Sequence, residues 1–143
     1  MPLIALREVQ TVLTDAFATG LRLRYGPDLG ALYREVAEYR PRVSLDEAAL
    51  RRCVELDTPP AVQNIVANKV TGATLRAFRS LLIGGALLGD KSAVERWATE
   101  GLNRCQYGDG DWPTTRPQWQ AVLKDPDGFI QMARQIKYYL NQL

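Results

Sequence analysis

Apolar residues recur every three or four positions along most of this chain, the spacing that places side chains on one face of an α-helix. In the first quarter the pattern predicts an amphipathic helix from about residue 3 to residue 24, ended by Tyr25-Gly26-Pro27. A second, shorter helix is predicted over residues 29–37. Arg40-Pro41 ends it, because the residue before a proline disfavours the helical conformation.

The middle of the chain carries two predicted helix starts. Ser44 and Glu47 have the spacing of a capping box, in which each side chain bonds a backbone N–H near the other residue. We expect this box to open a helix that runs through Leu56. Thr58-Pro59 then predicts a new helix, with Thr as the N-cap and Pro in the first turn, where its missing N–H costs nothing.

The second half of the chain predicts four further helices. Thr71 is expected to cap a helix that Gly84-Gly85 weakens and Gly89 closes. The predicted caps of the other three are Asp90, Thr115 and Asp125. No alternating strand pattern is longer than four residues. The sequence therefore predicts an all-α fold, a single bundle of about six to eight helices in one domain over residues 1–143.

The composition is that of a soluble globular protein, with 46% hydrophobic and 24% charged residues. The two cysteines, Cys53 and Cys105, are too few and too far apart to predict a disulfide framework. Each lies in an apolar helical stretch, so we expect buried free thiols and a reducing, cytoplasmic compartment. No signal peptide is recognisable, and the longest apolar run is too short for a membrane span.

Candidate catalytic and metal-binding groups are scarce. The chain has no histidine, and no pair of carboxylates stands out for acid–base work. The run Gly84–Ser92 has a negative Asp90 where a phosphate-binding loop needs its lysine, so a helix–helix corner is the better interpretation. Asp109-Gly110-Asp111 lies in a predicted loop and lacks the further oxygen ligands of a calcium site. We therefore expect no enzyme activity, no cofactor and no metal.

The distribution of charge is more informative than the net charge of +2. No acidic residue occurs between Asp57 and Asp90, although three cations do, and residues 129–143 are also free of acids. The cations and the neighbouring aromatic residue in these two segments are Lys69, Arg76, Arg79, Arg134, Lys137 and Tyr138. If the two helices lie side by side, they form a groove suited to the backbone and bases of a nucleic acid strand. Two ordinary solvated helix faces are the alternative.

The segment Val70–Arg79 resembles the small subunit of CRISPR effector complexes of the Cascade type. In that family a Thr-x-x-x-Leu/Ile-Arg-x-Phe-like stretch opens a core helix, here Thr71, Leu75, Arg76 and Phe78. The resemblance extends loosely over residues 58–143. Within the family the chain is similar to the small subunit of subtype I-D, which corresponds to the C-terminal part of the large subunit. It implies an all-α protein without catalytic activity. This protein contacts a guide RNA–target DNA duplex or the displaced strand. It also implies packing against other subunits and further copies of itself, with Trp112 and Trp119 at those contacts.

The leading hypothesis is therefore a non-catalytic, nucleic-acid-binding subunit that contacts phosphates through Lys69, Arg76 and Arg79, with Arg134 and Lys137 as a second set. The alternative is a protein–protein adapter or inhibitor, for example phage-encoded, that binds no nucleic acid. An exposed apolar or aromatic patch without a continuous positive surface would favour the adapter. An enzyme that uses carboxylates alone would instead need two acidic residues converging in a pocket. Whether DNA or RNA is bound stays open.

Overall fold

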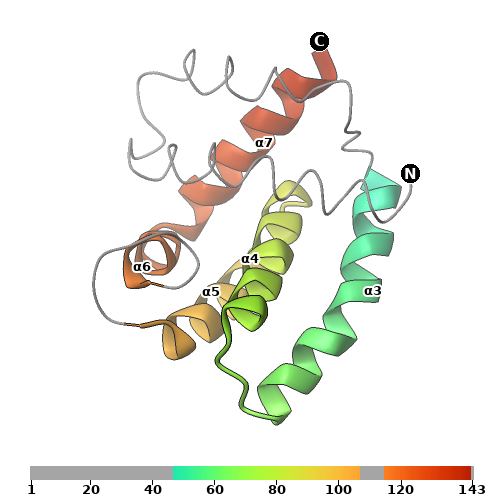
Figure 1. Cartoon of the computed structure of the whole chain (residues 1–143). Coiled ribbons are helices and arrows are strands. Elements are labelled where there is room, and N and C mark those ends of the chain that lie inside the picture. The colour runs from blue at the N-terminus through green and yellow to red at the C-terminus, as the bar shows by residue number, and fades with distance from the viewer. Residues whose placement is uncertain (1–46, 107–114, 143) are drawn as a thin grey trace.

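A computed structural model describes residues 47–106 and 115–142, which form five α-helices (Figure 1). The helices are α3 (Glu47–Val66), α4 (Gly72–Leu87), α5 (Lys91–Arg104), α6 (Arg116–Lys124) and α7 (Pro126–Gln142). Within this part of the chain the only β-type pairing is an isolated bridge between Gln106 and Thr115. The all-α prediction is confirmed for these residues. The helices predicted over residues 3–24 and 29–37, and Ser44 of the capping box, lie outside them.

Three of the predicted helix starts are made by the side chains that the sequence indicated. The Thr71 hydroxyl accepts a hydrogen bond from the backbone N–H of Thr74 at 3.2 Å, at the start of α4. Asp90 accepts from the N–H of Ala93 at 3.1 Å before α5. Asp125 accepts from the N–H of Gly128 at 3.0 Å before α7. Each of these oxygens satisfies a donor that the first helical turn leaves without a partner.

The corner between α4 and α5 is made by a glycine in the left-handed conformation. Gly89 has φ +72°, which costs glycine little because it has no Cβ. The N–H of Gly89 bonds the carbonyl of Ala86 at 3.0 Å, and the N–H of Asp90 bonds that of Gly85 at 2.8 Å. This is the Schellman pattern that ends a helix, as Gly89 predicted. Asp90 then caps α5, so one residue serves both helices.

The same pattern ends α3, with an asparagine in place of the glycine. Asn68 has φ +52° and its N–H bonds the carbonyl of Ile65 at 3.0 Å. The N–H of Lys69 bonds the carbonyl of Asn64, also at 3.0 Å. Asparagine tolerates this conformation better than most other residues. The chain therefore turns sharply between α3 and α4.

The helix start predicted at Thr58-Pro59 is wrong, because α3 runs from Glu47 through Pro59 and Pro60 to Val66 as one helix. The two prolines remove the N–H groups that would bond the carbonyls of Glu55 and Leu56. Both of those residues are exposed, so water can solvate their carbonyls. The Thr58 hydroxyl donates to the carbonyl of Val54 at 2.6 Å, which supports the turn just before the prolines. Burial of apolar residues on both sides of this point, among them Leu50 and Ala61, holds the helix together.

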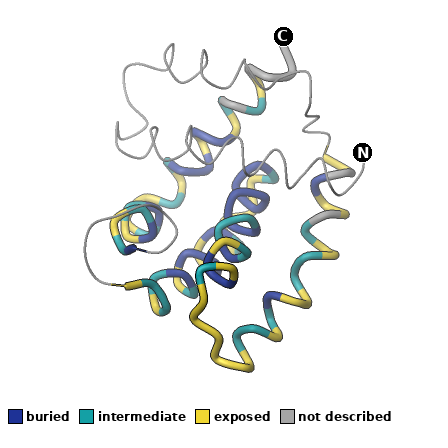
Figure 2. The backbone as a smooth tube through the Cα atoms, viewed as in Figure 1, coloured by how far each residue is buried: buried dark blue, intermediate teal, exposed yellow. Residues whose placement is uncertain are grey.

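Helix α4 is the centre of the packing, since α3, α5 and α7 all contact it. Every residue from Leu81 to Leu87 is buried, as the dark blue C-terminal half of α4 shows in Figure 2. Gly85 brings α5 close: a Cβ at this position would lie 2.9 Å from the Cβ of Ala93. Gly85 therefore permits a close helix contact, and the weakening predicted from Gly84-Gly85 stays a prediction. No helix in the described ranges has both the length and the apolarity to cross a bilayer.

Candidate functional site

The first set of predicted nucleic-acid-binding residues lies at the start of α4. Lys69 is exposed in the connection between α3 and α4, and Arg76 is exposed near the beginning of α4. Arg79 lies one turn further on, is half-buried and already makes an interaction within the protein. Leu75 and Phe78, in the same turns, are buried. Arg79 lies four residues after Leu75 and therefore on the same side of the helix, so of the two predicted arginines only Arg76 is exposed.

The second predicted set lies on α7. Arg134 is exposed, Lys137 is half-buried, and the Tyr138 side chain is 68% exposed. Phe129, Met132 and Ala133, in the first half of the same helix, are buried in the core. The C-terminal half of α7 therefore presents two cations and an aromatic ring at the surface.

The two sets do not come together, although α4 and α7 are in contact. The start of α4, with Lys69 just before it, lies at the end of the described structure opposite to the C-terminal half of α7 (Figure 1). The cations therefore form two separate surfaces, Lys69 and Arg76 on one and Arg134 and Lys137 on the other. A single groove lined by both helices is not formed by the described residues.

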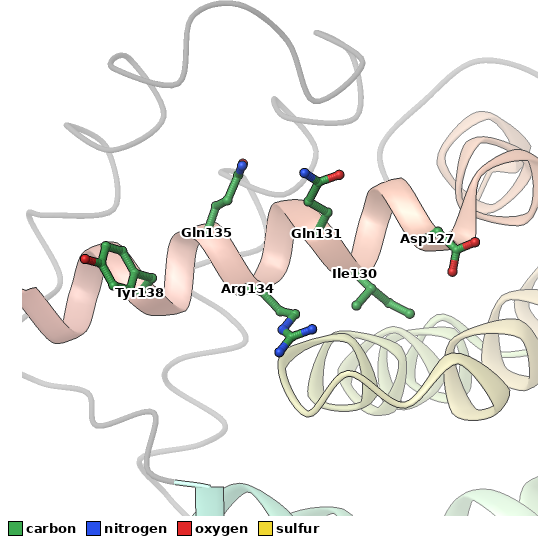
Figure 3. Close-up of a pocket in the computed structure, with 6 residues that line it drawn as sticks. All are labelled: Asp127, Ile130, Gln131, Arg134, Gln135 and Tyr138. Carbon is green, nitrogen blue, oxygen red and sulfur yellow. The ribbon is translucent and has the colours of Figure 1, made fainter.

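The described residues that line a groove at the surface all belong to helix α7. This groove has a volume of about 590 Å³ and is open to solvent. The residues that line it are Asp127, Ile130, Gln131, Arg134, Gln135 and Tyr138. Gln131 and Gln135 point to one side of the helix and Ile130 and Arg134 to the other, with Tyr138 at the C-terminal end (Figure 3). The groove thus combines a guanidinium, two amides, a phenol ring and one buried aliphatic side chain.

The one acidic residue among the described residues of the groove is already paired. A carboxylate oxygen of Asp127 lies 3.1 Å from the Lys91 ammonium at the start of α5. Beyond Asp127 the sequence of α7 contains no further acid, while Arg134 and Lys137 follow. Among the described residues that line the groove Arg134 is the cation, and because Asp127 is paired with Lys91 the Arg134 guanidinium is the group there that can bind an anionic ligand.

Several other cations are bound to partners inside the protein. A guanidinium nitrogen of Arg51 lies 2.7 Å from Glu47, and Arg104 pairs with Glu100 on α5. Arg96 lies over the Trp97 ring, 4.7 Å from its centroid. These arginines have structural partners of their own, so they add little to a binding surface.

Sequence reasoning missed Gln131, Gln135 and Ile130 as groove residues. A signal was present, since Gln131 and Gln135 lie four residues apart and therefore on the same side of the helix, as do Ile130 and Arg134. The glutamines are polar but uncharged, so a search for charged residues does not select them as binding residues. The cations on α7 were identified because their segment lacks acidic residues. This lack indicates the local charge of the segment but not where its side chains lie in the folded protein.

The expectation that Trp119 is an exposed contact residue between copies is wrong. Trp119 is 0% exposed and packs in the core against Gly101 of α5, where a Cβ would lie 2.5 Å from its ring. The absence of a side chain at Gly101 makes the space that the indole fills. Trp112 and Asp109-Gly110-Asp111 lie outside the described residues.

The Cys105 thiol is free and half-buried, and donates a hydrogen bond to the carbonyl of Leu102 at 3.4 Å. Burial raises its pKa above the ordinary value of a thiol, and the Arg116 guanidinium and a backbone hydrogen bond offset part of that rise. At neutral pH this thiol is protonated and therefore a poor nucleophile. Within residues 47–106 and 115–142, no three acidic or cysteine side chains gather into a metal-binding group.

No protein-family model, curated protein or solved structure matches this chain.

Proposed function

We propose that this protein is a non-enzymatic nucleic-acid-binding subunit and that the groove on α7 holds its ligand. The observation that carries the proposal is the content of this groove: Arg134 and Tyr138 share it, and Asp127, the acid among its described residues, is paired with Lys91. Arginine binds phosphate through its planar fork, and an exposed aromatic ring offers a stacking surface to a base. The two glutamines add hydrogen-bonding groups that suit base edges or sugars.

The exposure of Tyr138 favours a single strand over a duplex. Bases in a duplex are stacked on one another, whereas those of a single strand are free to stack on a protein ring. Lys69 and Arg76, at the other end of the described structure, provide a second phosphate-binding surface for a neighbouring part of an assembly.

The test is a fluorescence anisotropy titration with labelled single-stranded DNA and RNA of about 30 nucleotides. With phosphate contacts at Arg134 and Lys137, the logarithm of the affinity should fall with the logarithm of salt with a slope of about −1.4. This slope corresponds to a roughly sevenfold loss between ~50 and ~200 mM salt. Absence of binding at low salt would refute the proposal.

Two double reversals locate the surface. Arg134→Glu with Lys137→Glu should abolish binding, because it replaces two cations of α7 by anions. The matched control is Arg52→Glu with Lys124→Glu, which reverses two exposed cations that are not among the groove residues. Each reversal lowers the net charge by two, so both double variants go from +2 to −2. Equal losses in the two variants would show a general charge effect and contradict the assignment to α7.

A more specific form of the proposal is that the chain is the small subunit of a Cascade-type effector complex. Its support is the segment Val70–Arg79, in which Thr71 caps α4, Leu75 and Phe78 are buried and Arg76 is exposed. The test is to purify the tagged chain from cells that carry a CRISPR array and to sequence the RNA that copurifies. Enrichment of repeat-derived guide RNA would support this form, and its absence would refute it without affecting nucleic-acid binding itself.

A protein–protein adapter is the second candidate function. The observation that favours it is the exposure of Leu56, Val66 and Val70, three large apolar side chains near one another along the chain. An adapter of this kind would not bind the labelled strands at low salt, so the anisotropy titration separates the two functions.

A further inference from the structure

The two sides of the groove on α7 carry different chemistry. Ile130 and Arg134 point to one side of the helix (Figure 3). Gln131 and Gln135 point to the other. Tyr138 follows Arg134 by four residues and Gln135 by three, the two spacings that make side chains of successive helical turns neighbours. The phenol ring therefore has a cation as its neighbour on one side and an amide on the other.

The protein itself does not occupy these polar groups. The side chains of Gln131, Arg134 and Gln135 make no hydrogen bond or ion pair with another residue in the part of the chain that the structure describes. The Tyr138 side chain is 68% exposed. Only the Asp127 carboxylate, among the described groove residues, is held in an ion pair. A guanidinium, two amides and a ring face are thus available to a ligand at the same time.

The amides discriminate between bases in a way that a cation does not. A glutamine amide presents a donor and an acceptor side by side. The N7 edge of adenine presents the complementary pair, the N6 amino group and the N7 acceptor, so one amide makes two hydrogen bonds with it. The same edge of guanine presents two acceptors, which match a guanidinium and not an amide. Of the two purines, whose larger rings cover more of a tyrosine, adenine is therefore the one that the amides fit.

The length of the groove sets how many bases it can hold. Its lining runs from Asp127 to Tyr138, a rise of about 16 Å along the helix axis. Successive bases of a stacked strand are about 3.4 Å apart, so the groove spans about four or five of them. A strand in which every third base is adenine therefore always places an adenine in the groove.

From these observations we infer that Gln131 and Gln135 are specificity-determining residues that make the α7 groove prefer adenine among the bases of a single strand. A base stacks on Tyr138, an amide bonds the N6 and N7 atoms of an adenine, and Arg134 binds a phosphate. The inference rests on the proposed function, because it requires that the groove binds a strand. It adds a preference for sequence, which contacts with phosphates alone do not provide.

Anisotropy titrations of the full chain at low salt, with labelled single strands of about 30 nucleotides, test the inference. One strand contains only thymine, and in three others every third base is adenine, cytosine or guanine. Each strand is made as DNA and as RNA, with uracil for thymine. The adenine strand should bind about fivefold more tightly than the thymine strand, the lower end of the discrimination by a bidentate base contact, and more tightly than the other two. A binder without base contacts shows at most a modest preference, for example for pyrimidine runs.

A double variant removes the amides. Gln131→Met with Gln135→Met keeps the side-chain length and the helix propensity but deletes both amides. It should bind the thymine strand as the wild type does and lose the preference for the adenine strand. The matched control is Gln63→Met with Gln120→Met, which changes exposed glutamines of α3 and α6 that are not among the groove residues. This control should keep the preference.

A modified base and a ring variant separate edge contacts from stacking. 7-Deazaadenine keeps the ring and the N6 amino group but has a C–H in place of N7. Its strand should bind less tightly than the adenine strand, because each amide loses one of its two hydrogen bonds. Tyr138→Ala should instead weaken the binding of every strand, by about fivefold or more.

The outcomes distinguish this inference from the proposed function. Equal affinity of the wild type for the four strands, or a preference for another base, would overturn the inference and leave the proposed function in place. An adenine preference that survives in Gln131→Met with Gln135→Met, or that 7-deazaadenine does not reduce, would overturn it as well. Absence of binding of every strand would overturn both.

Discussion

The contact between Gly101 and Trp119 allows a sharp test of the packing. Gly101 lies inside α5, where replacing glycine by alanine stabilises an unconstrained helix by about 0.8–1.0 kcal/mol. In this protein the added Cβ would lie 2.5 Å from three ring carbons of Trp119. Carbon atoms normally approach to about 3.5 Å, so the ring or the helix must retreat by about 1 Å.

The ring has little freedom to move, because Trp119 is fully buried and α6 packs on α5 along this contact. Overpacking of a well-packed core costs about 1–3 kcal/mol, and we expect the upper part of that range. After subtracting the gain in helix propensity, Gly101→Ala should lower the free energy of unfolding by about 2 kcal/mol. For a chain of this size the melting temperature should fall by about 8 °C.

The assay is urea unfolding followed by circular dichroism at the helix band. Gly72→Ala is the matched control, since its Cβ would meet only the guanidinium end of the flexible Arg76 side chain, with Nη1 at 3.3 Å and Cζ at 3.9 Å. This control should be as stable as the wild type or slightly more stable. Repeating Gly101→Ala in a Trp119→Phe background should remove most of its cost, because the smaller ring vacates part of the space. An unchanged wild-type midpoint for Gly101→Ala, or an equal cost in both backgrounds, would refute the reasoning.

Three further predictions concern single residues. Asn68→Gly should stabilise the protein by about 0.5–1 kcal/mol in the same urea assay, because glycine adopts the left-handed conformation without a Cβ penalty; a lower midpoint would contradict this account of the α3 end. Asp90→Ala should cost about 1 kcal/mol by removing the cap of α5, and Asp90→Asn should restore most of it. Cys105 should alkylate slowly at neutral pH and faster as the pH rises toward its raised pKa. Mass spectrometry of its peptide measures this rate, and alkylation as fast as that of an unfolded control would show that burial does not protect the thiol.

Helix ends in this protein follow from local chemistry, and the sequence therefore predicts them well. Thr71, Asp90 and Asp125 cap helices because a short polar side chain needs only the next turn of its own backbone. Gly89 ends α4 for an equally local reason. Asn68 makes a corresponding turn, which a search for glycine alone overlooks.

The continuity of α3 through Pro59 and Pro60 is where a local rule fails. The sequence correctly shows that two backbone hydrogen bonds are lost there. It does not show that the freed carbonyls face water while Leu50 and Ala61 are anchored in the core on both sides. Tertiary packing therefore keeps α3 helical through the two prolines.

The cations of the candidate site were predictable from the sequence, but the groove and its uncharged residues were not. The lack of acids identifies the cations on α4 and α7, and both helices form as expected. Lys69 and Arg76 lie far from Arg134 because of the way in which α4 and α7 cross. The spacing of residues along the sequence does not reveal this crossing. Trp119 shows the same limit, since its burial depends on the missing side chain at Gly101 in another helix.

The arrangement of α3 on the outside of α4 has a consequence for the motions of the protein. Among the described helices α3 packs chiefly on α4, whereas α4 and α5 each have three helical neighbours. An element with one neighbour can detach while the rest keeps its core. Amide protons of α3, interrupted at Pro59 and Pro60, should therefore exchange with solvent by local opening, while those of residues 81–87 should exchange only on global unfolding. Hydrogen exchange would thus divide the chain into a stable centre and a separately opening outer helix.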